Sequence, residues 1–303
     1  MMQEDPGLVR LLSRIHDQRG MDFTQYKERS IIRRIRVRMR RHNVASYNDY
    51  IGILDSRPEE YQELMDTLTI NVTEFFRNPE SFRAIEDIVI PRVLFAKRRH
   101  RHKIIRVWSC GCSSGDEPFS LAILLLEKLG EARSNFLLTI IGSDIDKGAL
   151  EEARNTVYSA SRLGALDQQL LDKYFDPIQE GQFRLKSPVK SLVRFREHDV
   201  IKNAPFMHCD IILCRNLMIY FNKELQEEIL LKFYQCLNPG GFLVLGMVET
   251  LVGSAMDVFE KVDNVLRIYR RPETTESLGE KGEVLSQKDV DRIVQDMLEE
   301  EAP

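Results

Sequence analysis

Apolar residues in the first part of the chain recur at helical spacing. In residues 22–43, Ile31, Ile32, Ile35 and Met39 fall on one face of a helix. Residues 46–70 continue the pattern as two shorter amphipathic segments, which are interrupted around residues 56–58. Because no strand-like alternation occurs in this part, residues 1–69 are predicted to form a small all-α domain.

The pattern changes at Lys103, where apolar strand segments begin to alternate with helical ones. This alternation predicts an α/β fold, with helices on both faces of a sheet. Residues 163–195 interrupt it and are interpreted as a helix followed by a small β excursion at about 181–195. The expected strands are residues 103–110, 136–145, 192–200, 209–220, 242–247 and 265–271, and the expected helices are residues 118–130, 146–159 and 222–241.

The predicted sheet domain spans residues 70–271, and the chain becomes polar beyond it. Residues 272–283 are typical of a flexible linker, and residues 286–301 have the pattern of a short amphipathic helix. We therefore predict an acidic linker and a short helix over residues 272–303.

The composition indicates a globular protein with a real core. Hydrophobic residues make up 43% of the 303 positions and charged residues 30%. No run approaches the ~18 apolar residues of a membrane-spanning helix. The first residues are acidic and lack a long apolar stretch, so they do not have the pattern of a signal peptide. We expect a cytoplasmic protein that does not insert into the membrane.

The cysteines are interpreted as small buried apolar side chains. They are odd in number and lie mostly in strand-like contexts, so a disulfide framework is not expected. Their spacings also do not match a zinc finger or ribbon, and no metal site is predicted. The five positions are Cys110, Cys112, Cys209, Cys214 and Cys236.

The net charge of −4 hides a strongly basic segment at residues 27–41. Arginines recur there along one helical face, at positions Arg29, Arg33, Arg36 and Arg40. Such a stripe has three interpretations: a surface that binds nucleic acid, a solvated helix face, or a docking surface for an acidic protein segment. No aromatic residues interleave with the arginines and the chain as a whole is not basic, so nucleic acid is not expected as a partner.

The stretch VWSCGCSSGDEPFSLAILLLE, residues 107–127, passes from an apolar strand through small residues to an apolar helix. In an open α/β sheet this turn, after the first strand, is a ligand-binding position. It has neither the lysine of a triphosphate-binding loop nor a strict G-x-G-x-x-G spacing. Asp116 and Glu117 would repel a pyrophosphate but suit hydroxyls or an ammonium group. A plain strand–helix connection with a capped helix is the alternative.

Other polar residues follow the predicted strands. Asp144 ends the second strand, where an acidic residue commonly binds ribose hydroxyls, and Asp146 is the alternative. Arg215, Asn216 and Tyr220 follow the fourth strand. Before the first strand, Asn78 and Pro79 predict a helix start, with Asn78 as N-cap. Local spacing in the preceding INVTEFFR predicts that Phe75 and Phe76 belong to the core.

Together these segments resemble the chemotaxis receptor methyltransferases, the CheR family. The resemblance covers roughly residues 8–271 and is carried by LTINVTEFFRNPESF, VWSCGCSSGDEPFSLA, SDID, LVRFREHDV, DIILCRNLMIYF and LNPGGFLVLG, in the family's order. It implies an S-adenosylmethionine-dependent methyltransferase fold of the Rossmann-like class, preceded by a small all-α domain. It also implies transfer of a methyl group from S-adenosylmethionine to glutamate side chains of chemoreceptors, giving glutamate methyl esters and S-adenosylhomocysteine for sensory adaptation.

The resemblance further implies roles for individual residues. Arg77 and Tyr220 would place the substrate carboxylate, although Arg77 could instead hold the carboxylate of the cofactor. The stripe of four arginines would bind the glutamate-rich receptor helix. The residues expected to bind the cofactor are Asn71, Thr73, Arg77, Glu117, Asp144, Asp199, Val200, Arg215 and Asn216.

The chain departs from the family pattern at two places. The family often has asparagine followed by an aliphatic residue where this chain has Asp199 and Val200, and threonine with a Glu-Glu pair where it has SCGCSSGDEP. A non-catalytic domain of the same fold that senses S-adenosylmethionine or docks partners is the main alternative. A nucleotide-dependent oxidoreductase is a second one, against which the missing G-x-G-x-x-G and the LNPGGFLVLG segment argue. A third alternative is a methyltransferase of the same kind whose substrate is a receptor outside chemotaxis.

The expected partner is the cytoplasmic helical region of chemoreceptors, to which a monomeric enzyme would be recruited in the membrane receptor arrays. The β excursion resembles a subdomain that some members of the family use to tether to a receptor C-terminal peptide.

Overall fold

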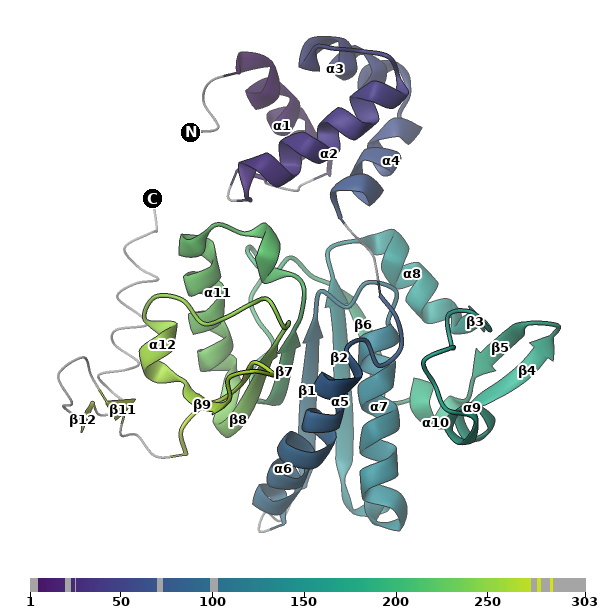
Figure 1. Ribbon diagram of the computed structural model, residues 1–303, viewed down its shortest axis with the longest axis vertical. Helices are drawn as coiled ribbons and strands as arrows, with labels where there is room; N and C mark the ends of the chain where they lie inside the picture. Colours follow the sequence, from purple (N-terminus) through teal and green to yellow (C-terminus); the bar gives the residue numbers. More distant parts are fainter. Residues whose placement is uncertain are drawn as a thin grey trace. The chain divides into compact units, whose positions relative to one another are not determined.

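The computed structural model describes residues 5–19, 23–24, 26–69, 73–98, 103–273, 277–278 and 284–285. Contacts within the chain divide it into two units (Figure 1). The first comprises Met1–Asn71 and Tyr220–Leu225, and the second comprises Val72–Ile219 and Gln226–Pro303. The first boundary lies two residues beyond the one predicted at residue 69.

The first unit is helical, as predicted. Its helices are α1 (Pro6–Arg19), α2 (Glu28–Arg41), α3 (Tyr47–Ser56) and α4 (Glu59–Leu68). The Ser46 hydroxyl caps α3 by accepting a hydrogen bond from the Asp49 N–H. Helix α3 ends at Ser56, inside the predicted break, because the following Arg57-Pro58 disfavours helix. Apolar side chains from all four helices form the core of the unit, among them the fully buried Leu11, Ile35, Tyr50 and Leu64.

A short segment from far along the chain completes this helical unit. The Lys27 N–H donates a 2.8 Å hydrogen bond to the Tyr220 carbonyl. The ring of Phe221, 1% exposed, meets Tyr26 edge-on at 5.0 Å. The Arg34 guanidinium lies over the Tyr220 ring, 4.7 Å from its centroid. The predicted strand at residues 209–220 therefore ends earlier than expected, at Cys214.

Helix α2 carries two sets of arginines with different surroundings. Arg34 and Arg38 are buried, whereas the predicted stripe of Arg29, Arg33, Arg36 and Arg40 is exposed. Arg38 donates from Nε and Nη2 to the two carboxylate oxygens of Glu60, at 2.9 and 2.6 Å. Glu60 is 3% exposed and also accepts from the Tyr50 hydroxyl at 2.6 Å. His42 Nε2 lies 2.8 Å from its Oε2 atom.

Glu60 should make the stability of the protein sensitive to acid. Burial alone would raise the pKa of Glu60, but hydrogen bonds from Arg38, Tyr50 and His42 outweigh it and lower the pKa to about 2. The contribution of the ionised group is therefore complete above the unfolded-state pKa of 4.5 and is lost as the pH falls toward 2. We expect this group to account for a loss of roughly 2–3 kcal/mol of unfolding free energy across that range.

Denaturant titrations of the wild type and of Glu60→Gln at several pH values measure this contribution. The variant should be less stable at neutral pH by about 3 kcal/mol, because the buried Arg38 then keeps only the exposed carboxylate of Glu63 as a charged partner. The difference between the two proteins should shrink as the pH falls. A constant difference from neutral pH to pH 2 would contradict the assignment.

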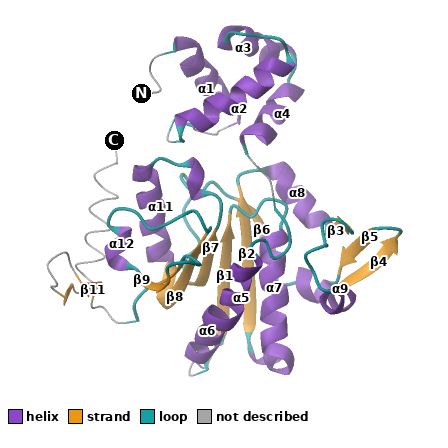
Figure 2. Ribbon diagram, viewed as in Figure 1, coloured by secondary structure: helices purple, strands orange, loops and turns teal. Residues whose placement is uncertain are grey.

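The second unit is built on a mixed seven-stranded sheet, in the order β6-β2-β1-β7-β8-β10-β9. Figure 2 shows strands of this sheet in orange, with helices beside them. The first five of these strands run parallel, and β10 pairs antiparallel with both β8 and β9. This confirms the predicted α/β class. The strand bounds are β1 (Ile104–Cys110), β2 (Leu137–Asp144), β6 (Val193–Glu197), β7 (Cys209–Cys214), β8 (Leu237–Leu245), β9 (Glu260–Asp263) and β10 (Ile268–Arg270).

Helices connect and cover these strands. Helices α6 and α7 contact β1, and α8 contacts β2 and β6. The helix bounds are α5 (Pro79–Ala84), α6 (Ile90–Lys97), α7 (Asp116–Leu129), α8 (Lys147–Asn155), α9 (Gln168–Tyr174), α10 (Ser187–Lys190), α11 (Lys223–Cys236) and α12 (Ala255–Val258), with a π-helical turn at Ile85–Val89 and 3-10 turns at Gly130–Asn135 and Met218–Tyr220.

A separate three-stranded antiparallel sheet, which we call the small sheet, consists of β3 (Val157–Ser159), β5 (Gln182–Leu185) and β4 (Phe175–Gln179). The predicted bounds of 181–195 for this excursion were wrong at both ends. Thr156 adopts a left-handed backbone with φ +56° and ends α8, so the next residues pair with β5 instead of continuing the predicted helix. Strand β6, in contrast, pairs with β2 in the main sheet.

Beyond Glu273 the structure describes two short strands, β11 (Ser277–Leu278) and β12 (Val284–Leu285), which pair with each other. The helix predicted at residues 286–301 lies outside the described residues. In the described part of the chain, no helix is both long and apolar enough to cross a membrane. All five cysteines are free and buried, as predicted.

Candidate cofactor site

The order of the strands marks the ligand-binding edge of the sheet. From β1 the chain proceeds to β2 and β6 on one side, and β7 then starts the other side. Ligands of open α/β sheets bind outside the carboxyl ends of the strands at such a switch point. The ends of β1 and β7 lie next to each other here, because Cys110 and Cys214 are partners in the register.

The turn after β1 has the predicted strand–turn–helix form. Gly111, Ser113 and Gly115 have φ values of +73°, +48° and +88°, and helix α7 begins at Asp116. The N–H groups of Gly111 and Cys112 both donate to the Ser143 carbonyl, at 2.8 and 2.9 Å. The backbone of the turn is thus fixed to the end of β2.

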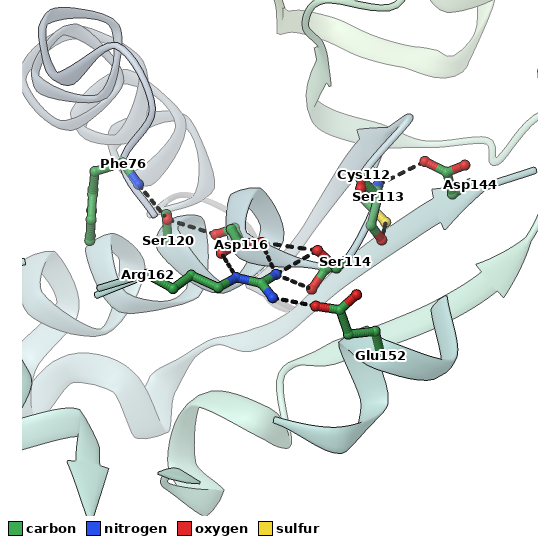
Figure 3. A network of polar contacts seen from close by, with 9 residues as sticks. All are labelled: Phe76, Cys112, Ser113, Ser114, Asp116, Ser120, Asp144, Glu152 and Arg162. Atoms are coloured by element: carbon green, nitrogen blue, oxygen red, sulfur yellow. Dashed lines mark hydrogen bonds and ion pairs between the residues drawn. The ribbon is translucent and has the colours of Figure 1, made fainter. Parts of the chain in front are cut away.

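Asp144, at the end of β2, faces this turn (Figure 3). Its Oδ2 accepts a 2.7 Å hydrogen bond from the Ser113 N–H, and its Oδ1 accepts a 2.9 Å bond from the Asp146 N–H. Burial raises the pKa of the Asp144 carboxyl. Asp146, the sequence alternative, instead caps α8 by accepting from the Ala149 N–H. The Ser113 hydroxyl is buried and has no hydrogen-bond partner within the described residues.

Glu117 and Arg215 form the centre of a second group of contacts. Glu117 accepts from the Ser109 hydroxyl at 2.7 Å and from Arg215 Nη1 at 3.1 Å. Arg215 Nη2 also donates to the Arg77 carbonyl at 2.7 Å and to Asn78 Oδ1 at 3.0 Å. Arg215 therefore fixes the Arg77–Asn78 segment to the start of α7. Its direct contact with the cofactor stays a prediction.

Asn78 corrects one detail of the sequence interpretation. It occupies the N-cap position of α5 as predicted, but its φ is +58° and its side chain makes no capping hydrogen bond. The side-chain oxygen is used by Arg215 instead. The fixed φ of Pro79 at the first helical position starts the helix without that cap.

Glu249 was missed by sequence reasoning. Its Oε2 accepts from the N–H groups of Gly246 and Asn216, at 2.6 and 2.9 Å, and its Oε1 accepts from the Ile219 N–H at 3.2 Å. It is 4% exposed, and burial raises its pKa. Glu249 thus holds the turn after β7, where Asn216 has φ +61°. Glu249 lies in the mainly apolar stretch LGMVETLVG, which gave no signal of this role.

The remaining predicted residues are placed as follows. Asp199 Oδ1 accepts from the Ile201 N–H at 2.8 Å, so this carboxylate stabilises its own turn, while Val200 is partly buried. Thr73 and Arg77 are partly buried on either side of Phe75, which is fully buried as predicted. Tyr220 belongs to the helical unit by its contacts. Asn71 lies outside the described residues.

A sheet with a glycine-containing first turn, and with a carboxylate facing it from the second strand, is suited to a nucleoside ligand. Residues 71–267 match the family model described as the SAM-binding domain of CheR methyltransferase, which makes this an S-adenosylmethionine-dependent methyltransferase. Residues 6–69 match the all-alpha domain of the same family. The chain belongs to the CheR methyltransferase family, and the sequence resemblance is confirmed.

Relatives of similar length share about a third of their residues with this chain. A chemotaxis protein methyltransferase of Salmonella typhimurium is 33% identical over 255 residues, which are 81% of this chain and 84% of the relative. One of Borreliella burgdorferi is 30% identical over 82% of this chain and 89% of the relative. Among solved structures, PKMT2 from Rickettsia typhi in complex with AdoHcy is 15% identical, with a TM-score of 0.33 over 57% of this chain and 26% of that one. A superposition this limited adds nothing to the assignment.

S-adenosylmethionine is the cofactor, as predicted. The site fits a nucleoside in two respects. The Asp144 carboxylate accepts from backbone N–H groups and still has lone-pair capacity for a hydroxyl donor. The unpartnered Ser113 hydroxyl beside it is a further polar group that a ligand would satisfy. The family and its relatives assign the protein to S-adenosylmethionine-dependent methylation in chemotaxis.

Proposed function

We propose that the protein methylates glutamate side chains on the cytoplasmic helices of chemoreceptors, giving glutamate 5-O-methyl esters. The observation that carries this proposal is the stripe of exposed arginines on α2, in a chain that belongs to a family of chemotaxis methyltransferases. An acidic helix is the natural partner of such a surface, because opposite charges steer and orient the encounter.

Methyl transfer to a carboxylate requires the protein to align the two reactants more than to transfer a proton. The bound cofactor supplies a methyl group on a positively charged sulfur. A glutamate carboxylate, with a pKa near ~4.3, is already ionised at neutral pH and needs no general base. Holding the two reactants in line can supply up to ~7–11 kcal/mol of the barrier in favourable cases. Excluding water helps further, because both charges are neutralised in the reaction.

Each site residue has an assigned part in this proposal. Asp144 accepts hydrogen bonds from the ribose hydroxyls. Glu117 meets the amino-acid end of the cofactor, with its orientation fixed by Ser109 and Arg215. The other cofactor contacts come from Asn71, Thr73 and Arg77 before α5, from Asp199 and Val200 after β6, and from Asn216 after β7.

Arg77 and Tyr220 are assigned to the substrate carboxylate. The guanidinium of Arg34, which is itself fixed to the Leu68 carbonyl, lies over the Tyr220 ring and restricts its orientation. Tyr220 would then present its hydroxyl to the incoming glutamate, and Arg77 its positive charge. The enzyme acts as a monomer in the cytoplasm and is recruited to receptor arrays by the α2 surface.

The double substitution Arg33→Glu with Arg36→Glu should raise KM for a receptor fragment by about tenfold or more, because two attractive contacts become repulsive. The dissociation constant for S-adenosylhomocysteine should stay unchanged. Arg10→Glu, an exposed position on α1, is the matched control and should leave KM near the wild-type value. An unchanged KM in the double variant would make the stripe a merely solvated surface.

The direct test of the activity is a transfer assay on receptor cytoplasmic fragments with radiolabelled S-adenosylmethionine. Mass spectrometry should place the label on glutamate, and mild alkali should release it as methanol. Cofactor binding without transfer to any receptor fragment would favour the alternative, a sensing or docking domain of the same fold.

A further inference from the structure

Arg162 follows β3 and binds the turn of the cofactor site (Figure 3). Its Nε donates to Asp116 Oδ1 at 2.9 Å, and its Nη2 donates to Asp116 Oδ2 at 2.5 Å. Nη2 also donates to the hydroxyl and, at 3.4 Å, to the carbonyl of Ser114. Because the Asp116 side chain is completely buried, this bidentate pair lies largely out of solvent.

The remaining contacts of Arg162 reach two other elements. Its Nη1 pairs with Glu152 on α8. Its guanidinium carbon lies over the ring of Tyr158 on β3, 5.0 Å from the centroid. One side chain thus joins the cofactor turn, the start of α7, α8 and the small sheet.

The turn that Arg162 contacts has a conformation that needs support. Ser113, directly before Ser114, is left-handed, which costs a non-glycine residue about 1–2 kcal/mol. The same Ser113 provides the N–H that binds Asp144. A turn in this state persists only where its surroundings over-determine it. Arg162 supplies part of those surroundings from the opposite side of the turn to Asp144.

The small sheet has a second connection to the cofactor site. Phe75, between Thr73 and Arg77, meets the rings of Tyr158 and Phe175 edge-on, at 5.1 and 5.6 Å. Phe76 in turn donates its N–H to the Ser120 hydroxyl, which binds the Asp116 carbonyl. The small sheet therefore contacts two segments to which cofactor binding is assigned.

We propose that Arg162 is a positioning residue for the cofactor, through which the cofactor turn and the small sheet are energetically coupled. A ligand that fixes the turn then also stabilises the small sheet, and anything that stabilises the small sheet raises the affinity for the cofactor to the same extent. This inference rests on cofactor binding alone and is independent of the methyl acceptor.

Arg162→Gln tests it, because glutamine keeps polar character but cannot hold Asp116, Ser114 and Glu152 together. The dissociation constant for S-adenosylhomocysteine, measured by calorimetry, should rise by about tenfold or more. Hydrogen exchange supplies the second measurement. Binding should slow the exchange of the amides of Val157–Ser159 in the wild type, and this response should be lost in the variant.

Two controls separate positioning from general stability. Glu152→Gln removes only the solvent-facing partner and should bind the ligand like the wild type. Val93→Ala, in the buried core of the second unit on α6 and away from both the turn and the small sheet, should lower the melting temperature but leave the affinity unchanged at a temperature where the variant is fully folded. If Arg162→Gln does not fold, Arg162→Lys gives the same comparison. Lysine keeps the positive charge beside Asp116 but cannot donate to both carboxylate oxygens as the guanidinium does. Wild-type affinity with an unchanged exchange response in the folded variant would overturn the proposal.

Discussion

Asp144→Asn should weaken the binding of S-adenosylhomocysteine by about 100-fold or more while leaving the protein folded. The carboxylate is proposed to accept hydrogen bonds from both ribose hydroxyls, and charge-assisted bonds are worth roughly 1.5–3 kcal/mol each. An amide also presents a donor where the wild type has only acceptors, and it would face the N–H of Ser113 or of Asp146. Calorimetric titration with S-adenosylhomocysteine measures the loss.

Asp146→Asn is the matched control, because it makes the same chemical change two residues further on. Asp146 caps α8, and asparagine caps a helix about as well as aspartate, so this variant should keep both stability and affinity.

The affinity of the wild type for S-adenosylhomocysteine should also fall at low pH, because the raised pKa of Asp144 brings its protonation to a higher pH than usual. Tight binding by Asp144→Asn would remove this residue from the cofactor site.

Arg77→Ala should lower kcat for methyl transfer to receptor fragments by about 10²–10³-fold, the usual cost of removing a group that orients or stabilises charge in the transition state. The backbone of Arg77 is held by Arg215 through its carbonyl. That contact survives the substitution, so the turn and the fold should be retained. Single-turnover rates with a radiolabelled cofactor measure the effect on the chemical step.

Affinity for S-adenosylhomocysteine distinguishes the two roles assigned to Arg77. If Arg77 places the substrate, kcat falls and the dissociation constant stays the same; if it holds the cofactor carboxylate, the dissociation constant rises as well. Arg83→Ala, which removes an exposed arginine from α5, is the control and should behave like the wild type. Near-wild-type turnover by the Arg77→Ala variant would show that Arg77 has no part in the mechanism.

Local patterns were sufficient for those features that depend on neighbouring residues. The helices of the first unit, the turn after β1 and the carboxylate at the end of β2 all follow from periodicity, small residues and strand ends within a few positions. The role of Arg162 did not follow, because its partner Asp116 is 46 positions away in the sequence. Glu249 was missed for the same reason, since its partner Asn216 is 33 positions away.

The errors at the small sheet have a local cause. Residues 146–159 have a helical pattern, yet the helix stops at Asn155 because Thr156 turns the backbone left-handed. Threonine gives no sequence warning of such a turn, in contrast to glycine. At Asn78 the local rule predicted the position of the helix start correctly, but the side chain serves a distant arginine. A tertiary contact thus redirected the side chain of Asn78 from the capping role that its local preference had suggested.

The participation of Tyr220–Leu225 in the helical unit limits how this protein can exchange parts with its relatives. The chain passes between the two units at three places: after residues 71, 219 and 225. A recombination that replaced only residues 1–71 would bring a foreign surface against Phe221, which packs on Tyr26. Chimeras that aim to transplant the helical unit therefore need residues 220–225 from the same donor as residues 1–71. Substitutions in these two segments are expected to occur together among relatives.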